Sequence, residues 1–267
     1  MKPGILVISH GSREREWVSR IDETVESAKA AFNGLVPVVG AFLELVEDRL
    51  IPDGLRQLEA EGVTDLLAIP FFVSSGSTHV DEIGWALGAY ASPRTDTDLT
   101  KFRVNARLTY GKPLDEDEEI AEVLLDRLAE LSADPRRESL LLVAHGSGEP
   151  EFLAAWRRGT EGLCAKLRER GGYADAEAAL LLPDEVAEKW RALRRRRPLD
   201  DILALPLFLS GGYFTSVAVP KRLAGLDCRY NGRPLLPHPA LSRWIVRQSR
   251  RWLENIGTSV MKRGDHG

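Results

Sequence analysis

Short apolar runs alternate with amphipathic stretches along the whole chain. In the first half, the apolar runs that predict strands are residues 5–9, 36–45, 64–73 and 106–110. The stretches in which apolar residues recur at helical spacing are residues 14–32, 50–61 and 118–131. A strand that is apolar on both faces is buried on both faces, so this order predicts a parallel sheet with helices on its two sides.

The second half of the chain repeats this order of elements. Its predicted strands are residues 140–144, 176–182 and 202–208. Its predicted helices are residues 150–170, 184–196 and 240–255. The recurrence indicates an internal duplication. If it is real, short sequence motifs should also recur at a constant separation.

Three motifs recur at nearly constant separation. His-Gly-Ser at 10–12 returns at 145–147, 135 positions later. Pro-Phe-Phe at 70–72 returns as Pro-Leu-Phe 136 positions later, and Gly76 returns as Gly212, again 136 positions later. We therefore predict an α/β protein of two tandem, similar domains, residues 1–132 and 139–257. Each is a three-layer α/β/α unit around a parallel sheet, and the joint is the polar, proline-containing stretch between them.

The composition argues against several classes of partner. The 267 residues carry a net charge of −4, so no basic field attracts nucleic acid. The basic run at 194–197 ends a predicted helix, where the helix dipole favours positive charge. No apolar run of about 18 residues occurs, so we expect neither a membrane span nor a signal peptide. Cys164 and Cys228 form no metal-type pair, and we expect a protein of the reducing cytoplasm.

Polar residues follow three of the predicted strands. His10 comes after the first strand, Glu44 ends the second, and His79 lies in a predicted loop after the third. Because ligands bind beyond the carboxyl ends of strands in an open parallel sheet, we expect these three side chains at one edge. Two imidazoles and a carboxylate suit a first-row divalent metal ion, and they also suit proton transfer near neutral pH.

These residues lie in stretches that resemble a known family. SHGSR at 9–13, FLEL at 42–45 and PFFVSSGSTHVDEI at 70–83 are similar to the sirohydrochlorin chelatases of the CbiX/SirB type, in their long two-domain form. The resemblance covers nearly the whole chain, in order and with the duplication. It implies insertion of Fe²⁺ or Co²⁺ into sirohydrochlorin without ATP, in siroheme or cobalamin biosynthesis. The ion is then a substrate, and no cofactor is tightly bound.

The resemblance also implies roles for individual residues. His10 and His79 become the metal-facing histidines and Glu44 their acidic partner, with both metal-binding and catalytic roles. Sirohydrochlorin is a polycarboxylate, so arginine side chains and backbone N–H groups are candidates to hold it. The candidate substrate-binding residues are Ser9, Gly11, Ser12, Arg13, Ser75, Gly76, Ser77, Thr78 and Tyr213.

The second copy keeps only part of this set. It retains His145, whereas counting without gaps places Thr215 opposite His79 and Leu180 opposite Glu44. We therefore interpret the second domain as a degenerate copy without the metal site. Tyr213 and Phe214 can pack on a flat ring, although packing between domains explains them equally well.

Two other functions remain open at this stage. One is a carrier that binds a tetrapyrrole or a metal ion without catalysis. The other is a chelatase for a different tetrapyrrole, such as a protoporphyrin-type ring, for which an apolar pocket is expected. The sequence does not choose between Fe²⁺ and Co²⁺, because both accept the same ligands.

Overall fold

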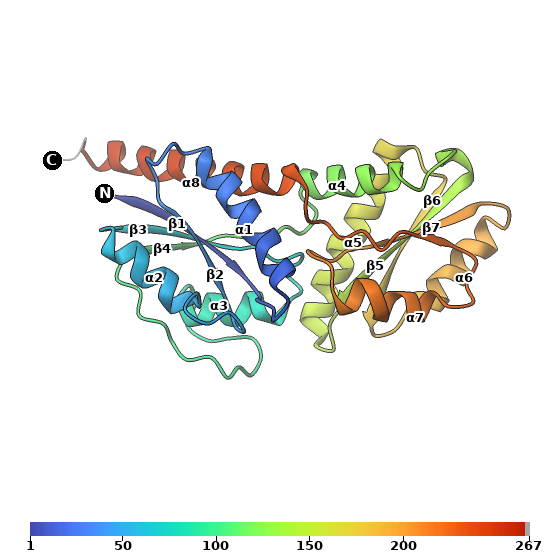
Figure 1. Cartoon of the computed structure of the whole chain (residues 1–267), viewed down its shortest axis with the longest axis horizontal. Coiled ribbons are helices and arrows are strands. Elements are labelled where there is room, and N and C mark those ends of the chain that lie inside the picture. The colour runs from blue at the N-terminus through green and yellow to red at the C-terminus, as the bar shows by residue number, and fades with distance from the viewer. Residues whose placement is uncertain (265–267) are drawn as a thin grey trace. The chain divides into compact units, whose positions relative to one another are not determined.

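The protein contains two parallel sheets of four strands each (Figure 1). The computed structural model describes the backbone of residues 1–264 and the side chains of residues 1–257. The strand orders are β2-β1-β3-β4 and β6-β5-β7-β8, so the two halves share one topology. Every strand pair in both sheets is parallel. The predicted α/β fold with two similar sheets is confirmed.

The first sheet consists of β1 (Pro3–Ser9), β2 (Val38–Phe42), β3 (Asp65–Pro70) and β4 (Arg107–Tyr110). The helices that follow these strands are α1 (Arg15–Ala30), α2 (Ile51–Ala60), α3 (Thr78–Leu87) and α4 (Glu118–Ala129). Residues Ile5–Ile8 of the central strand β1 are completely buried, because helices cover both faces of the sheet. Figure 1 shows α1 on one side of this sheet and α2 and α3 on the other.

The second sheet consists of β5 (Glu138–Gly146), β6 (Asp175–Leu182), β7 (Asp201–Pro206) and β8 (Arg229–Tyr230). Its helical elements are the 3₁₀ turn η1 (Pro135–Arg137), α5 (Pro150–Gly171), α6 (Val186–Arg196), the π-helical turn η2 (Phe214–Ala218), α7 (Val219–Leu223) and α8 (Pro239–Gly264). The turns η1 and η2, the helices α3 and α7 and the short strand β8 were not predicted from the sequence. Of these, α3 matters most for function, since it places His79 in a helix and not in a loop.

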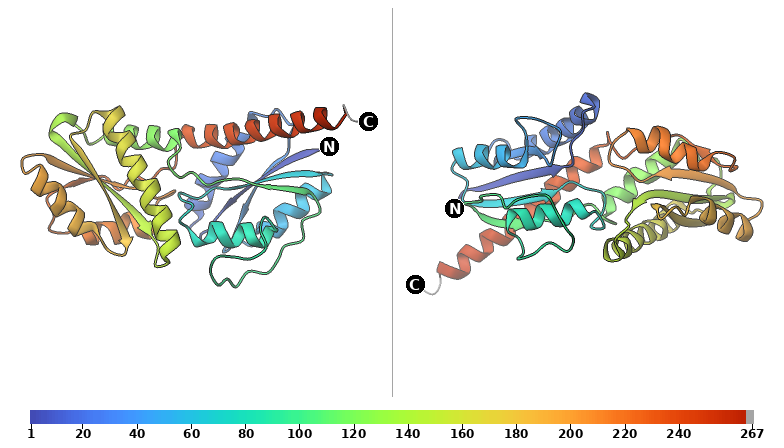
Figure 2. Two further views of the ribbon diagram at one scale, coloured as in Figure 1. Left: turned by 180° about the vertical axis from the view of Figure 1, so that it is seen from behind. Right: turned by 90° about the horizontal axis from the view of Figure 1, so that it is seen from below.

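The compact units differ from the predicted domains. One unit contains residues 1–71 and 79–113 together with the chain from Leu241 onward, and the other contains residues 72–78 and 114–240. The last helix, α8, therefore belongs to the first unit, although it follows the second sheet in sequence (Figure 2). Likewise α4, which follows the first sheet, belongs to the second unit. Boundaries at 132 and 139 divide the repeats in sequence, but they do not divide the folded units.

Side-chain contacts explain why each of these two helices belongs where it does. The indole of Trp244 in α8 stacks on Phe71 with ring centroids 5.9 Å apart. Trp252 Nε1, also in α8, donates a hydrogen bond of 3.0 Å to Thr109 Oγ1 in β4. In the second unit, the guanidinium of Arg127 in α4 donates to the carbonyl oxygens of three residues that precede α8: Pro234, Leu235 and Pro237.

Three of the four arginines in the charged run at the end of α6 pair with carboxylates. Arg194 pairs with Asp227, Arg196 with Asp175 and Arg197 with Asp200. This agrees with a helix terminus and gives no basic patch for a polyanion. Both cysteines are free, and burial raises the pKa of the Cys164 thiol to about 12. Among the helices of the described chain, none has the length and apolar character needed to cross a bilayer.

A buried carboxylate fixes the joint between the repeats. The side chain of Glu138, at the start of β5, accepts hydrogen bonds from the amides of Ala133 and Asp134, the hydroxyl of Ser132 and the guanidinium of Arg229. Burial alone would raise the pKa of Glu138, but these donors together hold that pKa below its usual value. Glu138 therefore stabilises the fold in its ionised form.

Replacing Glu138 with glutamine is expected to lower the free energy of unfolding by about 2 kcal/mol at pH 7, because an ionised acceptor is lost. A lowered folded-state pKa adds stability above the unfolded pKa of about 4.3, and this stability disappears as the pH falls through the folded-state pKa. Thermal melts at pH 7 and pH 3 should show a larger difference between parent and variant at pH 7 than at pH 3. The exposed Glu188→Gln variant is the control, and an equal Glu138→Gln deficit at both pH values would contradict this account.

Candidate functional site

His10, Glu44 and His79 come together at the carboxyl edge of the first sheet. His10 Nε2 lies 3.7 Å from Glu44 Oε1. The rings of His10 and His79 meet edge to face, with centroids 4.7 Å apart and an interplanar angle of 75°. The side chains of His10, Glu44 and His79 are 36%, 53% and 40% exposed, so an ion or a flat molecule can reach them. Their convergence, predicted from the strand order, is confirmed.

Gly11 lets the backbone bring His10 and Glu44 together. The amide of Glu44 donates to the carbonyl oxygen of His10 at 3.0 Å, which extends the pairing of β1 with β2 beyond both strands. Gly11 has a φ of +105°, and a Cβ at this position would lie 1.9 Å from the carbonyl oxygen of Glu44. Only glycine permits this close approach of the two chain segments.

The backbone also orients the His10 ring. His10 Nδ1 lies 3.1 Å from the carbonyl oxygen of Gly11. A carbonyl oxygen can only accept, so Nδ1 is the donor in this contact, and in the neutral ring the lone pair is then on Nε2. Two ligand atoms that each lie about 2.0–2.2 Å from a metal ion can be at most about 4.4 Å apart. The separation of 3.7 Å between His10 Nε2 and Glu44 Oε1 is therefore compatible with one shared ion.

His79 is held by a carboxylate that the sequence analysis missed. It lies in the first turn of α3, and its Nδ1 is 2.5 Å from Oε1 of Glu82, three residues later on the same helix face. The hydrogen bond from His79 outweighs the effect of burial and lowers the pKa of Glu82. The spacing His-x-x-Glu would have revealed this pair had residues 78–87 been recognised as a helix.

Within the described residues, no three His, Cys, Asp or Glu side chains form a ready-made metal cage. The three predicted ligands instead form an open group at the sheet edge, in which His10 contacts both of the others. Their role as metal ligands stays a prediction.

The serine- and glycine-rich segment after β3 does not offer the free amides that were predicted. The amide of Ser75 donates to Asp115 Oδ1 at 2.7 Å, and the amide of Gly76 donates to Ser74 Oγ at 3.0 Å. The amide of Ser77 donates to the carbonyl oxygen of Ser74. These three N–H groups already have acceptors within the protein, and the role of Ser75, Gly76 and Ser77 in holding substrate carboxylates stays a prediction. The role of Thr78 also stays a prediction.

The glycine in this segment is explained by packing. A Cβ on Gly76 would lie 2.4 Å from Cδ1 of Trp156, so the loop rests directly on the indole. The segment 72–78 belongs to the second compact unit, as does Trp156. Gly76 is thus needed for close packing within that unit.

The three candidate side chains next to His10 in sequence differ in exposure and in hydrogen bonding. Ser9 is completely buried, and its hydroxyl has no partner among the described residues, so it does not face a ligand. Ser12 Oγ accepts from the amide of Glu14 at 3.0 Å and fixes the turn into α1. Arg13 is exposed and forms no ion pair within the described residues, so it remains a candidate for binding an anionic group.

The second unit reproduces the backbone of this site with different side chains. His145 Nδ1 lies 3.0 Å from the carbonyl oxygen of Gly146, as in the first unit. The ring of Phe214 meets that of His145 with centroids 4.9 Å apart at 76°, which matches the geometry of His79 against His10. Phe214, and not Thr215, therefore takes the place of His79.

The gap-free match for Glu44 was also wrong. A Cβ on Gly146 would lie 2.1 Å from the carbonyl oxygen of Leu182, so Leu182, and not Leu180, stands opposite Glu44. The strand registers explain the error, since Ser9 pairs with Phe42 and Ala144 pairs with Leu180. The first pair is 33 positions apart and the second 36, so the connection is longer in the second half. The second unit still lacks the acid and the second histidine.

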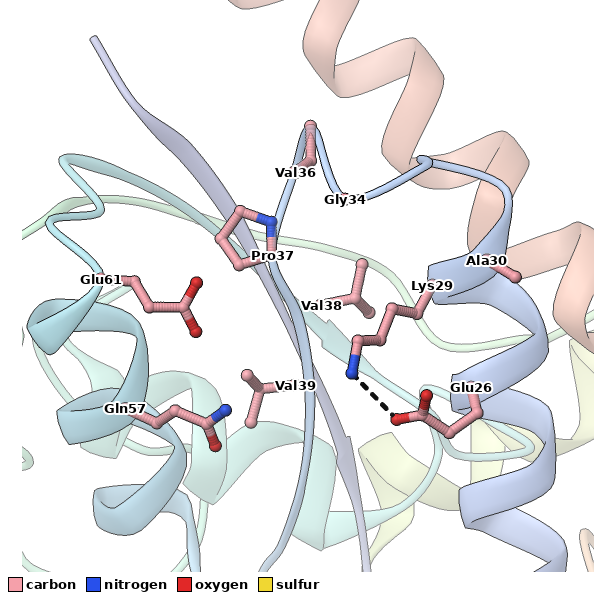
Figure 3. A pocket seen from close by; sticks show the side chains of 10 residues that line it. All are labelled: Glu26, Lys29, Ala30, Gly34, Val36, Pro37, Val38, Val39, Gln57 and Glu61. Carbon is pink, nitrogen blue, oxygen red and sulfur yellow. Dashed lines mark hydrogen bonds and ion pairs between the residues drawn. The ribbon is translucent and has the colours of Figure 1, made fainter.

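A separate pocket lies near the other end of β2, away from the histidines (Figure 3). Its volume is about 400 Å³, and its lining includes Val38 and Val39 of β2, Gln57 and Glu61. Figure 3 shows the ion pair between Lys29 and Glu26 on its wall, with a separation of 3.3 Å. None of the predicted site residues lines this pocket.

The fold matches that of solved chelatase structures. SirB from Bacillus subtilis with Fe³⁺ superposes with a TM-score of 0.72 at 21% identity, over 94% of this chain and 95% of that one. The structure of CbiX, described as the terminal enzyme of siroheme biosynthesis in denitrifying bacteria, gives a TM-score of 0.61 at 20% identity. It covers 93% of this chain and 98% of that one. The chain thus has the chelatase-like α/β fold.

Sequence comparison identifies the family. The CbiX family model matches residues 4–131 and again residues 139–251, once for each repeat. The chain belongs to the CbiX family.

The names of two curated relatives specify different metals. The sirohydrochlorin ferrochelatase of Bacillus subtilis (strain 168) is 24% identical over 169 residues, which are 63% of this chain and 59% of that protein. The sirohydrochlorin cobaltochelatase of Saccharolobus solfataricus is 30% identical over 130 residues, 48% of this chain and 94% of that protein.

Proposed function

We propose that this protein is a sirohydrochlorin chelatase, which inserts Fe²⁺ or Co²⁺ into the ring without ATP. The observation that carries the proposal is the convergence of His10, Glu44 and His79 at one accessible sheet edge. Family membership and the names of the relatives support the substrate class. The metal ion is a substrate that passes through the site, and we infer no tightly bound cofactor.

The chemistry of insertion explains why an open group of ligands is suitable. The ion must lose water, face the ring and then leave the protein for the four ring nitrogens. Imidazole nitrogens and one carboxylate oxygen bind first-row divalent ions, and a site that leaves coordination positions open can pass its ion on. We assign Nε2 of His10 and of His79 and the carboxylate of Glu44 to this transient site.

The free macrocycle must also lose two protons from its central nitrogens. Groups that accept them must lie within hydrogen-bond reach of the ring face. Glu44 is the most exposed of the three site side chains, and we assign it the first proton acceptance. As the ion moves from the protein to the ring nitrogens, an imidazole that it releases can accept the second proton.

Two exposed side chains are our candidates for binding the substrate, one for its carboxylates and one for its ring. Arg13 is exposed next to His10 and is our candidate for an ion pair with a ring carboxylate. Tyr213, whose side chain is 65% exposed, is our candidate for stacking on the flat ring. We further infer a cytoplasmic location, because both cysteines are unpaired thiols.

Anaerobic incubation with sirohydrochlorin and one ion at a time tests this function. The metallated ring should form faster with enzyme than without it, as followed by visible absorbance, and the preferred ion gives the faster rate. A carrier would bind ring and ion without accelerating insertion, and that outcome would overturn the proposal. Protoporphyrin as the alternative ring is the matched control for the substrate, and faster metallation of it would exclude sirohydrochlorin specificity.

A further inference from the structure

A long loop is fastened to the helix that carries His79. Residues 88–106 connect α3 to β4 without regular structure, and Figure 1 shows this loop extending beside α3. Arg94 of the loop binds Asp81 through its backbone amide and its guanidinium, both at 2.7 Å. The amide of Phe102 donates to the carbonyl oxygen of Ala86 at 2.8 Å. The loop therefore has a fixed position on α3.

One contact joins this loop to the site itself. Glu82, whose side chain is 16% exposed, binds His79 Nδ1 with Oε1 and binds Thr97 Oγ1 with Oε2 at 2.7 Å. The amide of Leu99 lies 3.1 Å from the same Thr97 hydroxyl oxygen. A backbone amide can only donate, so the Thr97 hydroxyl accepts a hydrogen bond from Leu99 and donates one to the Glu82 carboxylate.

The donor and the acceptor of each hydrogen bond between Leu99 and His79 can be assigned. The Glu82 carboxylate accepts from Thr97 on one oxygen, and its other oxygen can only accept from His79 Nδ1. With the proton fixed on Nδ1, the lone pair is on Nε2, the nitrogen that a metal ion can bind. Carboxylates that fix a metal-binding histidine in this way are common partners of such sites.

The second unit provides an internal comparison. Phe214 replaces His79 there, and the residue three positions later is the exposed Val217 in place of Glu82. The connection from α7 to β8 spans only residues 224–228, so the unit has no counterpart of the long loop. The carboxylate, the threonine and the loop are therefore present only in the copy whose second ring is a histidine.

We propose that Glu82, held in place by Thr97, is a positioning residue that keeps the proton of His79 on Nδ1 and presents Nε2 to the metal ion. The inference rests on the proposed function only for the identity of the ring that receives the ion. Binding of the ion to the protein can be measured without that ring. The alternative is that Glu82 only anchors the loop.

Glu82→Gln separates the two roles. The amide has the same shape, but the Thr97 hydroxyl selects its oxygen, which turns the NH₂ group toward His79. Nδ1 must then accept, and the proton moves to Nε2, where it blocks the metal ion. Co²⁺ affinity, measured by visible absorbance without any tetrapyrrole, should fall roughly 10–100-fold. A simple anchor predicts almost no loss, because the amide still contacts both neighbours.

Adding Thr97→Val to Glu82→Gln should restore part of this affinity, because the amide can then rotate and offer its oxygen to His79. Nitrogen-15 NMR of the histidine rings reports directly which nitrogen of His79 carries the proton. Thr100→Val, at an exposed position of the same loop, is the matched control and should change neither quantity.

The outcomes divide cleanly. If Glu82→Gln keeps both the parent's Co²⁺ affinity and the proton on Nδ1, the positioning role is overturned and Glu82 is an anchor. The same holds if thermal stability alone falls. If the parent inserts no metal but Co²⁺ affinity still depends on Glu82 and Thr97 as described, the inference stands and the proposed function fails. Should the double variant not fold, the single variant and the NMR measurement still decide.

Discussion

Replacing His10 or His79 with alanine is expected to lower the rate of metal insertion by roughly 10²–10⁴-fold, the range found when a positioned catalytic group is removed. Each substitution removes one of the two imidazoles that meet 4.7 Å apart at the sheet edge. Both side chains are more than a third exposed, so little core packing is lost and the melting temperature should remain close to that of the parent. Stopped-flow absorbance and thermal melts measure the two quantities.

His145 is the matched control for this experiment. Its Nδ1 lies near the following glycine carbonyl oxygen, as in His10, but its ring meets Phe214 instead of a histidine, and Leu182 stands at the position that corresponds to Glu44. His145→Ala should cost about 1 kcal/mol for its lost hydrogen bond and should retain insertion. Loss of insertion in a folded His145→Ala protein would show that the second unit contributes to the chemistry, and the site would have to include it.

Replacing Gly11 with alanine is expected to destabilise the protein by about 3 kcal/mol or more and to abolish insertion. The added Cβ would lie 1.9 Å from a backbone oxygen, and the φ of +105° is unfavourable for any other residue. Backbone must therefore move, which separates His10 from Glu44. Chemical denaturation and the insertion assay measure the two effects.

Gly146→Ala is the matched control, because it produces a similar steric clash in the second unit, away from His10, Glu44 and His79. Its Cβ would lie 2.1 Å from the carbonyl oxygen of Leu182 at a φ of +81°. A similar loss of stability with insertion retained is expected there. A Gly11→Ala protein that is as stable and as active as the parent would contradict the geometry described for this turn.

Much of the fold could be predicted because its strands are unusually uniform. Residues 5–8 and 140–144 are apolar without interruption, which is the consequence of burial on both sheet faces and is visible in the sequence. The place of the site followed from topology alone, since parallel strands bring His10, Glu44 and His79 to one edge.

Helix α3 could not be predicted from its pattern. Its residues include the buried Asp81 and Gly84, so the helical spacing of apolar residues is broken. Asp81 can be buried because it pairs with Arg94, 13 positions later in the loop that follows the helix. Missing this helix hid Glu82 as well, because a pair at positions i and i+3 is meaningful only on a helix.

The matches between the two repeats failed for another reason. Counting without gaps assumes equal connections, whereas the path from first to second strand differs in length between the halves. The exchange of α4 and α8 between the units is beyond local patterns altogether. The amphipathic stretch at 240–255 predicts a helix with a buried face, but that face carries no information about which sheet it covers.

The placement of α8 has a consequence for how the protein is made. β1 is synthesised before α8, and chain segments emerge from the ribosome in that order. The second unit consists of residues that are complete by position 240, so all of its parts are available before the last helix exists. The first unit, by contrast, lacks the completely buried Trp244 and the buried Trp252 of the same helix until α8 has been made. The unit that carries His10 and His79 is thus begun before the second unit and completed after it, and a nascent chain has no finished histidine-bearing unit before α8 has left the ribosome.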